Sequence, residues 1–283
     1  MQVIQKNSLT FLLILILSIN CVSCTENNSD KKPNNNQTSI PHTDGKGLPV
    51  KLPPLSESEK PHSSAEKLSF CSQECVTPFG QLLGEADGVK AYSNCQSTCV
   101  KPEYSFLNLK TKESSIHSSS SFNEDHHYIG VVHQCVEYAR KWWMLQHGIT
   151  FGSIDSAFEI IYLTHGKDIY TNKEFSLGRS VNGSAKRAPK RGDLLIYSAN
   201  RKDINWQHGH VAVVVNVDLD SGTLAVAEEN YNNRPWDDPK KYSRKIKISK
   251  TKNGYQVDDL DIHQQDPTKL GKISGWIYPL SNR

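Results

Sequence analysis

The seven cysteines constrain the fold of this chain most, because they fall into three groups with different chemistry. Two end an apolar N-terminal segment, four form two Cys-x3-Cys sets, and one stands alone: Cys21 and Cys24, then Cys71, Cys75, Cys95 and Cys99, and finally Cys135. A lone thiol followed by a distant histidine and a later carboxylate is the sequence form of a cysteine nucleophile, its base and the group that orients the base. Cys135 is therefore the candidate nucleophile.

The N-terminal segment has the features of an export signal. Lys6 precedes an apolar run over residues 11–19, which has the length of a signal-peptide core and is too short to span a bilayer comfortably. A buried core helix is the alternative, but the run lies at the extreme N-terminus and a polar tail follows it. Val22-Ser23-Cys24 resembles the lipid-attachment site of bacterial lipoproteins, with Cys21 where a Leu is usual. Residues 1–24 therefore predict a signal peptide of the lipoprotein type, with Cys24 lipidated at the periplasmic or cell-surface side, and simple secretion is the alternative.

The rest of the chain divides into a linker and one domain. Residues 25–67 are rich in Asn, Ser, Pro and Lys and have almost no large apolar side chains. Such a stretch cannot bury enough surface to offset its ordering entropy, so it predicts a disordered linker. Residues 68–283 are enough for one domain with a substantial core.

The two Cys-x3-Cys sets predict two disulfides if the chain is exported, because an oxidising compartment favours crosslinks. Cys71 would pair with Cys99 and Cys75 with Cys95 if both sets lie on short helices, but four cysteines allow three connectivities. A zinc site is the alternative. The usual cysteine spacing of zinc sites is tighter, and export argues against zinc.

The charge balance argues against a nucleic-acid module. The chain has 33 basic and 30 acidic residues, and its densest basic cluster joins Lys186-Arg187 to Lys190-Arg191. That cluster is typical of a solvated loop, and a contact to an anionic polymer is the weaker alternative. Neither a nucleic-acid partner nor a cofactor is expected.

The pattern of elements begins with short strands and a loop. Residues 79–84 and 88–93 predict a strand pair around a polar turn. Residues 105–125 are polar and include a pure serine run, so they predict a surface loop.

Helices come next and strands follow them. Apolar residues recur at helical spacing from Cys135 until Gly148 stops the helix, and a second helix begins at Ser156 with a capping-box pattern and runs to about Thr164. Five later segments favour strands: residues 193–198, 210–217, 223–229, 242–248 and 273–278. N-terminal helices packed on an antiparallel β-sheet form an α+β fold.

Cys135 is expected in the first turn of its helix. Backbone N–H groups there lack intrahelical partners and the helix dipole is positive, so a thiolate is stabilised. The same N–H groups can donate to the oxyanion of a tetrahedral intermediate, and Gln134 is an amide neighbour that could assist them. An inert core cysteine is the alternative, as most free cysteines are.

His210 is the candidate base. A structural histidine is the alternative, and His208, which shares the strand face, is the rival base. On the next predicted strand Glu228 and Asn230 share a face while Glu229 points away, so Glu228 or Asn230 could hold the tautomer of His210.

A metal site is the other interpretation of this region, since His126, His127, His133 and Cys135 lie close together in the sequence. Neither helical i,i+4 spacing nor a carboxylate ligand supports it, so no metal is expected.

These residues resemble the CHAP-type cysteine amidohydrolases, and more narrowly the amidase domain of bifunctional glutathionylspermidine synthetase/amidases and of trypanothione synthetases. The matching segments agree in order and spacing over nearly the whole predicted domain: Phe79–Gly84, Gly88–Ser93, Tyr128–Gly130, Gln134–Arg140, Arg187–Pro189, Gly192–Ile196, Gly209–Ala212, Ala227–Asn230 and Gly275–Ile277.

The resemblance implies a papain-like fold in which Cys135 is the nucleophile, His210 the general base and then acid, and Glu228 the orienting group. It also suggests that Arg140, one helical turn beyond the nucleophile, contacts a substrate carboxylate, although a surface or ion-pairing role explains Arg140 equally well. Gln134 and Asn230 complete the expected oxyanion and substrate set.

The chain departs from this family's pattern at four points. The ATP-dependent synthetase half has no counterpart, so no ligase activity is expected, and the bifunctional enzymes are cytosolic whereas this chain carries an export signal. His133 stands where the family usually has Trp. The cysteine sets and the serine-rich loop before Tyr128 are additions that could shape or cover the cleft.

The sequence therefore predicts an exported thiol amidase or peptidase. The resemblance favours a small-molecule amide of the glutathione–polyamine or γ-glutamyl type, whereas export favours peptidoglycan, although no wall-binding repeat accompanies the domain. A non-catalytic binding module is the third interpretation, and an altered Cys, His or carboxylate would have indicated it. The expected partners are the amide substrate and, through the lipid anchor, a membrane.

Overall fold

The computed structural model describes residues 71, 74–119, 125–259 and 271–280. The predicted signal peptide, the lipid-attachment residue Cys24 and the predicted linker all lie outside the described residues. Within the described residues, no helix is both long and apolar enough to cross a membrane.

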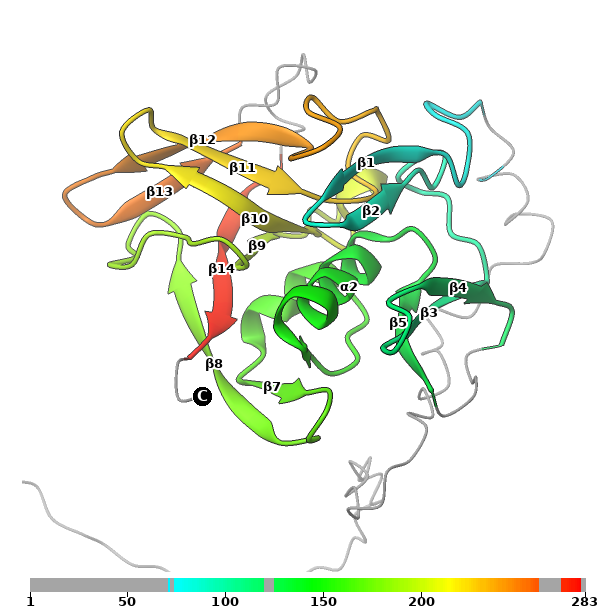
Figure 1. Cartoon of the computed structure of the whole chain (residues 1–283). Helices are drawn as coiled ribbons and strands as arrows, with labels where there is room; N and C mark the ends of the chain where they lie inside the picture. Colours follow the sequence, from blue (N-terminus) through cyan, green and yellow to red (C-terminus); the bar gives the residue numbers. More distant parts are fainter. Residues whose placement is uncertain (1–70, 72–73, 120–124, 260–270, 281–283) are drawn as a thin grey trace, which may run out of the picture. The chain divides into compact units, whose positions relative to one another are not determined.

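A nine-stranded sheet dominates the described part, and every neighbouring pair in it is antiparallel (Figure 1). In spatial order its strands are β13 (Tyr255–Asp258), β12 (Arg244–Lys250), β11 (Thr223–Ala227), β10 (His210–Asp218), β9 (Leu194–Tyr197), β14 (Ile273–Pro279), β8 (Glu174–Val181), β7 (His165–Asp168) and β6 (Ile149–Thr150). The five predicted C-terminal strands all belong to this sheet, so the predicted antiparallel sheet is confirmed.

The strands of two smaller sheets precede the large sheet in the sequence. They are the pair β1 (Leu82–Ala86) and β2 (Val89–Tyr92), and the three-stranded sheet of β4 (Ser114–His117), β3 (Tyr104–Asn108) and β5 (His126–Val131). The surface loop expected over residues 105–125 is therefore wrong where β3 and β4 form. Phe106 and Leu107 are buried and anchor β3, and this short apolar pair outweighs the polar composition around it.

The α-helix that the structure describes over its full length is α2 (Cys135–His147), which contacts both β5 and β10. Its backbone enters at Gln134 in an extended conformation and leaves at Gly148 with φ 64°, a left-handed position that glycine adopts without strain. The helix buries Tyr138, Trp142 and Trp143 against the sheet, which is why its apolar residues repeat at helical spacing.

The second predicted helix is a shorter 3-10 helix, η1 (Ala157–Tyr162), although the capping box of Ser156 and Glu159 forms as expected. Another 3-10 helix, η2 (Ile204–Trp206), precedes β10. The described part is thus mostly strand. The coarse α+β class fits it, but the expected set of N-terminal helices is not observed there.

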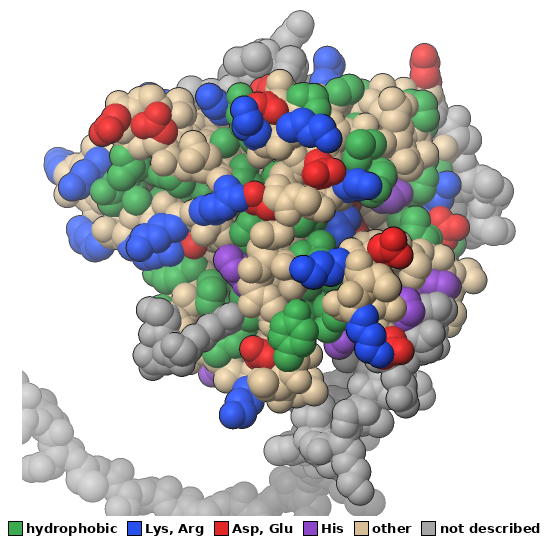
Figure 2. All heavy atoms as spheres, viewed as in Figure 1, with side chains coloured by type: hydrophobic (Ala, Val, Ile, Leu, Met, Phe, Trp, Pro, Cys, Tyr) green, Lys and Arg blue, Asp and Glu red, His purple; other side chains and the backbone are tan. Residues whose placement is uncertain are grey.

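Apolar side chains cover both faces of the large sheet. One core lies between the large sheet and the two helices α2 and η1. The other core lies on the opposite face of the sheet around Trp276, which has no exposed surface. Strand β12 alternates between the second core and solvent, with Ile246 and Ile248 inside and Lys245 and Lys247 outside. Figure 2 shows Lys and Arg side chains along this end of the sheet, with hydrophobic side chains between them.

Candidate active site

Cys135 is the first residue of α2, as the sequence predicts, and it is a partly exposed free thiol. The first backbone bond of the helix runs from Tyr138 N to Gln134 O, so the earlier N–H groups of the turn lack intrahelical partners. Strand β5 passes close to this turn, because a Cβ added to Gly130 would lie 2.7 Å from the Cβ of Glu137. Gly130 therefore permits the close approach of β5 to the start of the helix.

His210 is the first residue of β10 and is only 3% exposed. Its Nε2 lies 2.8 Å from Glu228 Oε2, so Nδ1 is the ring nitrogen that remains to interact with Cys135, whose proximity raises the pKa of His210. Burial lowers the pKa of His210, but the charge and hydrogen bond of Cys135, together with Glu228, more than offset burial and raise the pKa to about 9. Cys135, His210 and Glu228 thus lie next to one another, with His210 between the other two.

Glu228 is held by more than the histidine. Arg244 Nε donates to its Oε1 at 2.7 Å, and Ser243 Oγ donates to the same oxygen at 3.2 Å. Burial raises the pKa of Glu228, but the positive charge of Arg244 and the contact with His210 reverse the shift and lower the pKa to about 2. The carboxylate is therefore ionised across the ordinary pH range.

Arg244 has its own buried shell, which sequence reasoning missed. Its Nη1 donates to Asp259 Oδ1 at 2.6 Å, its Nη2 donates to Tyr197 Oη at 3.0 Å, and its guanidinium carbon lies 3.7 Å from the ring centroid of Tyr231. Arg244 stands at an inward position of β12 beside two isoleucines. A charged residue at an apolar position of an alternating strand was the signal that could have found it.

The side chains of Gln134 and Asn230 form a hydrogen bond with each other. Asn230 Nδ2 donates to Gln134 Oε1 at 2.6 Å, and Gln134 Nε2 donates to the carbonyl oxygen of Cys99 at 3.2 Å. The structure thus places both residues beside the nucleophile. Their contact with an oxyanion or a substrate stays a prediction.

Arg140 lies within α2 and is only 5% exposed. Its Nη1 donates to the carbonyl of Ile129 at 2.7 Å and its Nη2 to that of Gly152 at 3.2 Å, and its guanidinium lies over Phe151. Burial lowers its pKa to about 10. These partners give Arg140 a structural role, and a contact with a substrate carboxylate stays a prediction.

The other histidines lie apart from the His210–Glu228 pair. His208 is exposed and its Nδ1 lies 2.8 Å from Ser156 Oγ. His133 is 6% exposed and packs against the rings of Phe79 and Tyr92, and burial is the largest cause that lowers its pKa to about 4. His133 therefore belongs to the buried aromatic packing that precedes α2 in the sequence.

The candidate metal ligands are not assembled. Among the described residues, no three His, Cys, Asp or Glu side chains form a group that could hold a metal ion. His126 and His127 lie on β5, while Cys135 contacts His210 instead.

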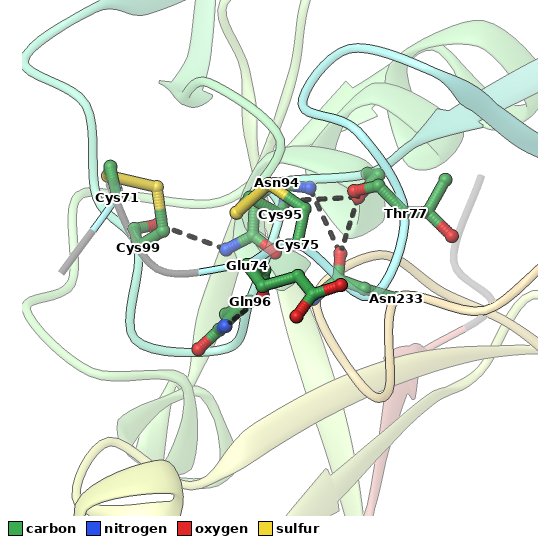
Figure 3. Close-up of a disulfide and its surroundings, with 10 residues drawn as sticks. Cys71, Glu74, Cys75, Thr77, Asn94, Cys95, Gln96, Cys99 and Asn233 are labelled. Carbon is green, nitrogen blue, oxygen red and sulfur yellow. Dashed lines mark hydrogen bonds between the residues drawn. A yellow bond between two sulfur atoms is a disulfide. The ribbon is translucent and has the colours of Figure 1, made fainter.

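The four paired cysteines form two disulfides, Cys71–Cys99 and Cys75–Cys95 (Figure 3). This is the connectivity that short helices would favour, yet Cys75, Cys95 and Cys99 all lie outside helices. The zinc alternative is wrong because all four sulfur atoms are covalently paired.

A thiol at a helix start that faces a buried histidine on an antiparallel sheet is an arrangement suited to nucleophilic hydrolysis. Residues 125–230, which include Cys135, His210 and Glu228, match the family described as CHAP domain. The resemblance inferred from the sequence is confirmed.

Curated relatives agree with this assignment. The chain is 30% identical over 183 residues to the bifunctional glutathionylspermidine synthetase/amidase of Escherichia coli (strain K12), which covers 64% of this chain and 27% of that protein. It is 28% identical over 201 residues to the trypanothione synthetase of Crithidia fasciculata, covering 71% and 26%. The chain thus spans about a quarter of the length of these relatives.

Proposed function

We propose that this protein cleaves an amide bond with Cys135 as nucleophile, His210 as general base and acid, and Glu228 as the orienting group, on a papain-like arrangement of helix and sheet. The observation that carries the proposal is the contact of His210 with both Cys135 and Glu228. The raised pKa of His210 supports a protonated ring at neutral pH, and a nearby imidazolium favours the thiolate form of a cysteine nucleophile.

In the proposed reaction the Cys135 thiolate attacks the carbonyl carbon, and the carbonyl oxygen becomes an oxyanion. The unpaired N–H groups at the start of α2 can donate to that oxyanion. The imidazolium of His210 then gives its proton to the leaving amine as the C–N bond breaks. Water attacks the acyl-enzyme, His210 takes a proton from that water, and the acid leaves while the thiol is restored.

Glu228 keeps His210 in the tautomer that presents Nδ1 to the thiol. Because Arg244 and Ser243 occupy the other carboxylate oxygen, Oε2 stays directed at His210. Arg244 also balances the negative charge of Glu228, which lowers the cost of burying it. A non-catalytic binding module would not need a histidine held in one tautomer by a buried carboxylate.

The favoured substrate is a small amide of the glutathione–polyamine or γ-glutamyl type. The support is the name of the relatives, glutathionylspermidine synthetase/amidase, whose similarity to this chain includes the candidate site. Peptidoglycan is the second candidate, and the signal peptide predicted over residues 1–24 favours it. We also propose that the protein is exported and anchored through Cys24, with a flexible stalk before the CHAP-containing domain.

Product analysis by mass spectrometry tests the function. The full chain and its Cys135→Ala variant are incubated with glutathionylspermidine and, separately, with purified peptidoglycan. Spermidine release that the variant loses supports the favoured substrate, whereas muropeptide release alone moves the proposal to the second. Equal product from both proteins, or none from either, contradicts the proposed function.

A further inference from the structure

The loop over residues 95–99 is the part of the molecule whose role the proposed mechanism leaves unexplained. Both disulfides end in it, Cys75–Cys95 at its start and Cys71–Cys99 at its end. Its cysteines are buried while residues 96–98 are partly exposed. A short segment fixed at both ends by crosslinks has little freedom to move, so contacts made by this loop are held in place.

One contact of the loop reaches the nucleophile's neighbour. The carbonyl oxygen of Cys99 accepts from Gln134 Nε2 at 3.2 Å and from Asn94 Nδ2 at 3.0 Å. Gln134 directly precedes Cys135 and also accepts from Asn230, so the start of α2 is joined to the loop on one side and to the segment after β11 on the other.

A second contact reaches the segment that leads into the base. Ser97 Oγ donates to Asn205 Oδ1 at 2.6 Å. Asn205 lies in η2, and the next residue, Trp206, places its ring edge-on to His210 with the ring centroids 6.4 Å apart. The loop is therefore joined to the His210 side as well as to the Cys135 side.

A third contact fixes the base of the loop to the segment after Glu228. The Oδ1 of Asn233, a residue only 2% exposed, accepts from Asn94 N at 3.0 Å and from Ser93 Oγ at 3.2 Å (Figure 3). The loop and its base thus contact Gln134, which adjoins Cys135, and Asn205 and Asn233, which lie five residues from His210 and from Glu228.

We propose that the loop over residues 95–99 is a positioning and specificity-determining element of the active site. It orients Gln134 beside the nucleophile, and its Ser97–Asn205 bridge closes one end of the substrate site. The site then accepts an amide that carries a small group on that side and excludes a continuous polymer. This substrate class rests on the proposed function, but the closure itself does not.

The test compares access to Cys135 for a small and a bulky thiol reagent. The full chain is treated with iodoacetamide or with a maleimide that carries a long polyethylene glycol chain, and loss of the unmodified Cys135 peptide is followed by mass spectrometry. Ser97→Ala and Asn205→Ala remove the bridge from either side, while Ser97→Thr keeps a hydroxyl. Ser221→Ala is the matched control, because Ser221 Oγ pairs with Thr223 Oγ1 at 2.9 Å in an exposed turn between β10 and β11.

We expect both bridge variants to raise the ratio of bulky to small reagent rates by about twofold to tenfold, the factor that one neutral hydrogen bond represents. Ser97→Thr and Ser221→Ala should keep the wild-type ratio. The same variants should raise peptidoglycan cleavage relative to glutathionylspermidine cleavage. A wild-type ratio in both bridge variants overturns the closure, whereas a chain that cleaves neither substrate overturns the proposed function and leaves the reagent ratio readable.

Discussion

Glu228 and Glu229 are adjacent in sequence, yet their carboxylates serve two separate buried clusters. Glu228 contacts His210 and Arg244, whereas Glu229 Oε1 accepts from Tyr92 N at 2.7 Å and lies 3.7 Å from Lys141 Nζ. Glu228 is 2% exposed and Glu229 is 1% exposed, so burial alone does not distinguish them. Their pKa values distinguish them. Arg244 and His210 lower the pKa of Glu228 despite its burial, whereas burial raises the pKa of Glu229 well above its usual range.

The same substitution at these two neighbours should therefore have different results. We expect Glu228→Gln to lower kcat by about a hundredfold, the lower end of what a positioned acid–base group contributes, because the amide cannot stabilise an imidazolium. Glu229→Gln should keep wild-type kcat, because Glu229 contacts Tyr92 and Lys141 rather than His210. Steady-state kinetics on the substrate that the wild type cleaves decides the matter, and equal losses in both variants would contradict the assignment of Glu228.

The pKa of His210 should depend on Cys135. Because Cys135 is the largest of the causes that raise this pKa, Cys135→Ala should lower it from about 9. An NMR titration of the histidine ring protons measures the change. A Cys135→Ala protein whose His210 still titrates near pH 9 would argue against the thiolate–imidazolium pair.

Stability should vary with pH on both sides of a plateau. The pKa of Glu228 falls from 4.5 to about 2 on folding, so its contribution is present above pH 4.5 and is lost as the pH falls through about 2. The pKa of His210 rises from 6.5 to about 9, so its contribution is present below pH 6.5 and is lost as the pH rises through about 9. Urea unfolding across this range should show both limbs, and Glu228→Gln should flatten the acid limb. An acid limb of unchanged slope in that variant would count against the lowered pKa.

Arg244 should matter for stability far more than its neighbour on the strand. Arg244→Met leaves Glu228 and Asp259 buried without their cation, and we expect a loss of about 3–5 kcal/mol in the free energy of unfolding. Lys245→Met, at the adjacent exposed position, should change that free energy by no more than about 0.5 kcal/mol. Chemical denaturation of the two variants makes the comparison, and similar losses would show that the buried ion pairs contribute little.

Local patterns in the sequence were enough to predict the start of α2 at Cys135 and its stop at Gly148, because both depend on residues within one or two turns. The alternation of Glu228 and Glu229 was also predictable from strand geometry. Arg244 was not, because it reaches Glu228 only through the pairing of β11 with β12, in which Val226 lies opposite Arg244. Register between strands depends on packing across the sheet, and a single sequence does not show it.

The same limit explains why the sequence did not show the contacts of Gln134 with Cys99 and of Ser97 with Asn205. Both act through partners far along the chain, Cys99 for Gln134 and Asn205 for Ser97. A polar loop with two cysteines shows only that it is crosslinked. Which segments of the chain the loop contacts depends on the tertiary fold.

Each disulfide joins a buried cysteine to a partly exposed one, Cys99 to Cys71 and Cys95 to Cys75, and this has a consequence for redox chemistry near Cys135. Cys135 is a partly exposed thiol whose neighbour Gln134 contacts Cys99, yet Cys99 and Cys95 have 0% and 1% of their surface exposed. Thiol–disulfide exchange requires a thiolate to approach a disulfide sulfur directly, so a sulfur without exposed surface resists attack. The sulfur atoms of Cys95 and Cys99, on the side of the loop that Gln134 contacts, can therefore stay oxidised near the reduced thiol of Cys135.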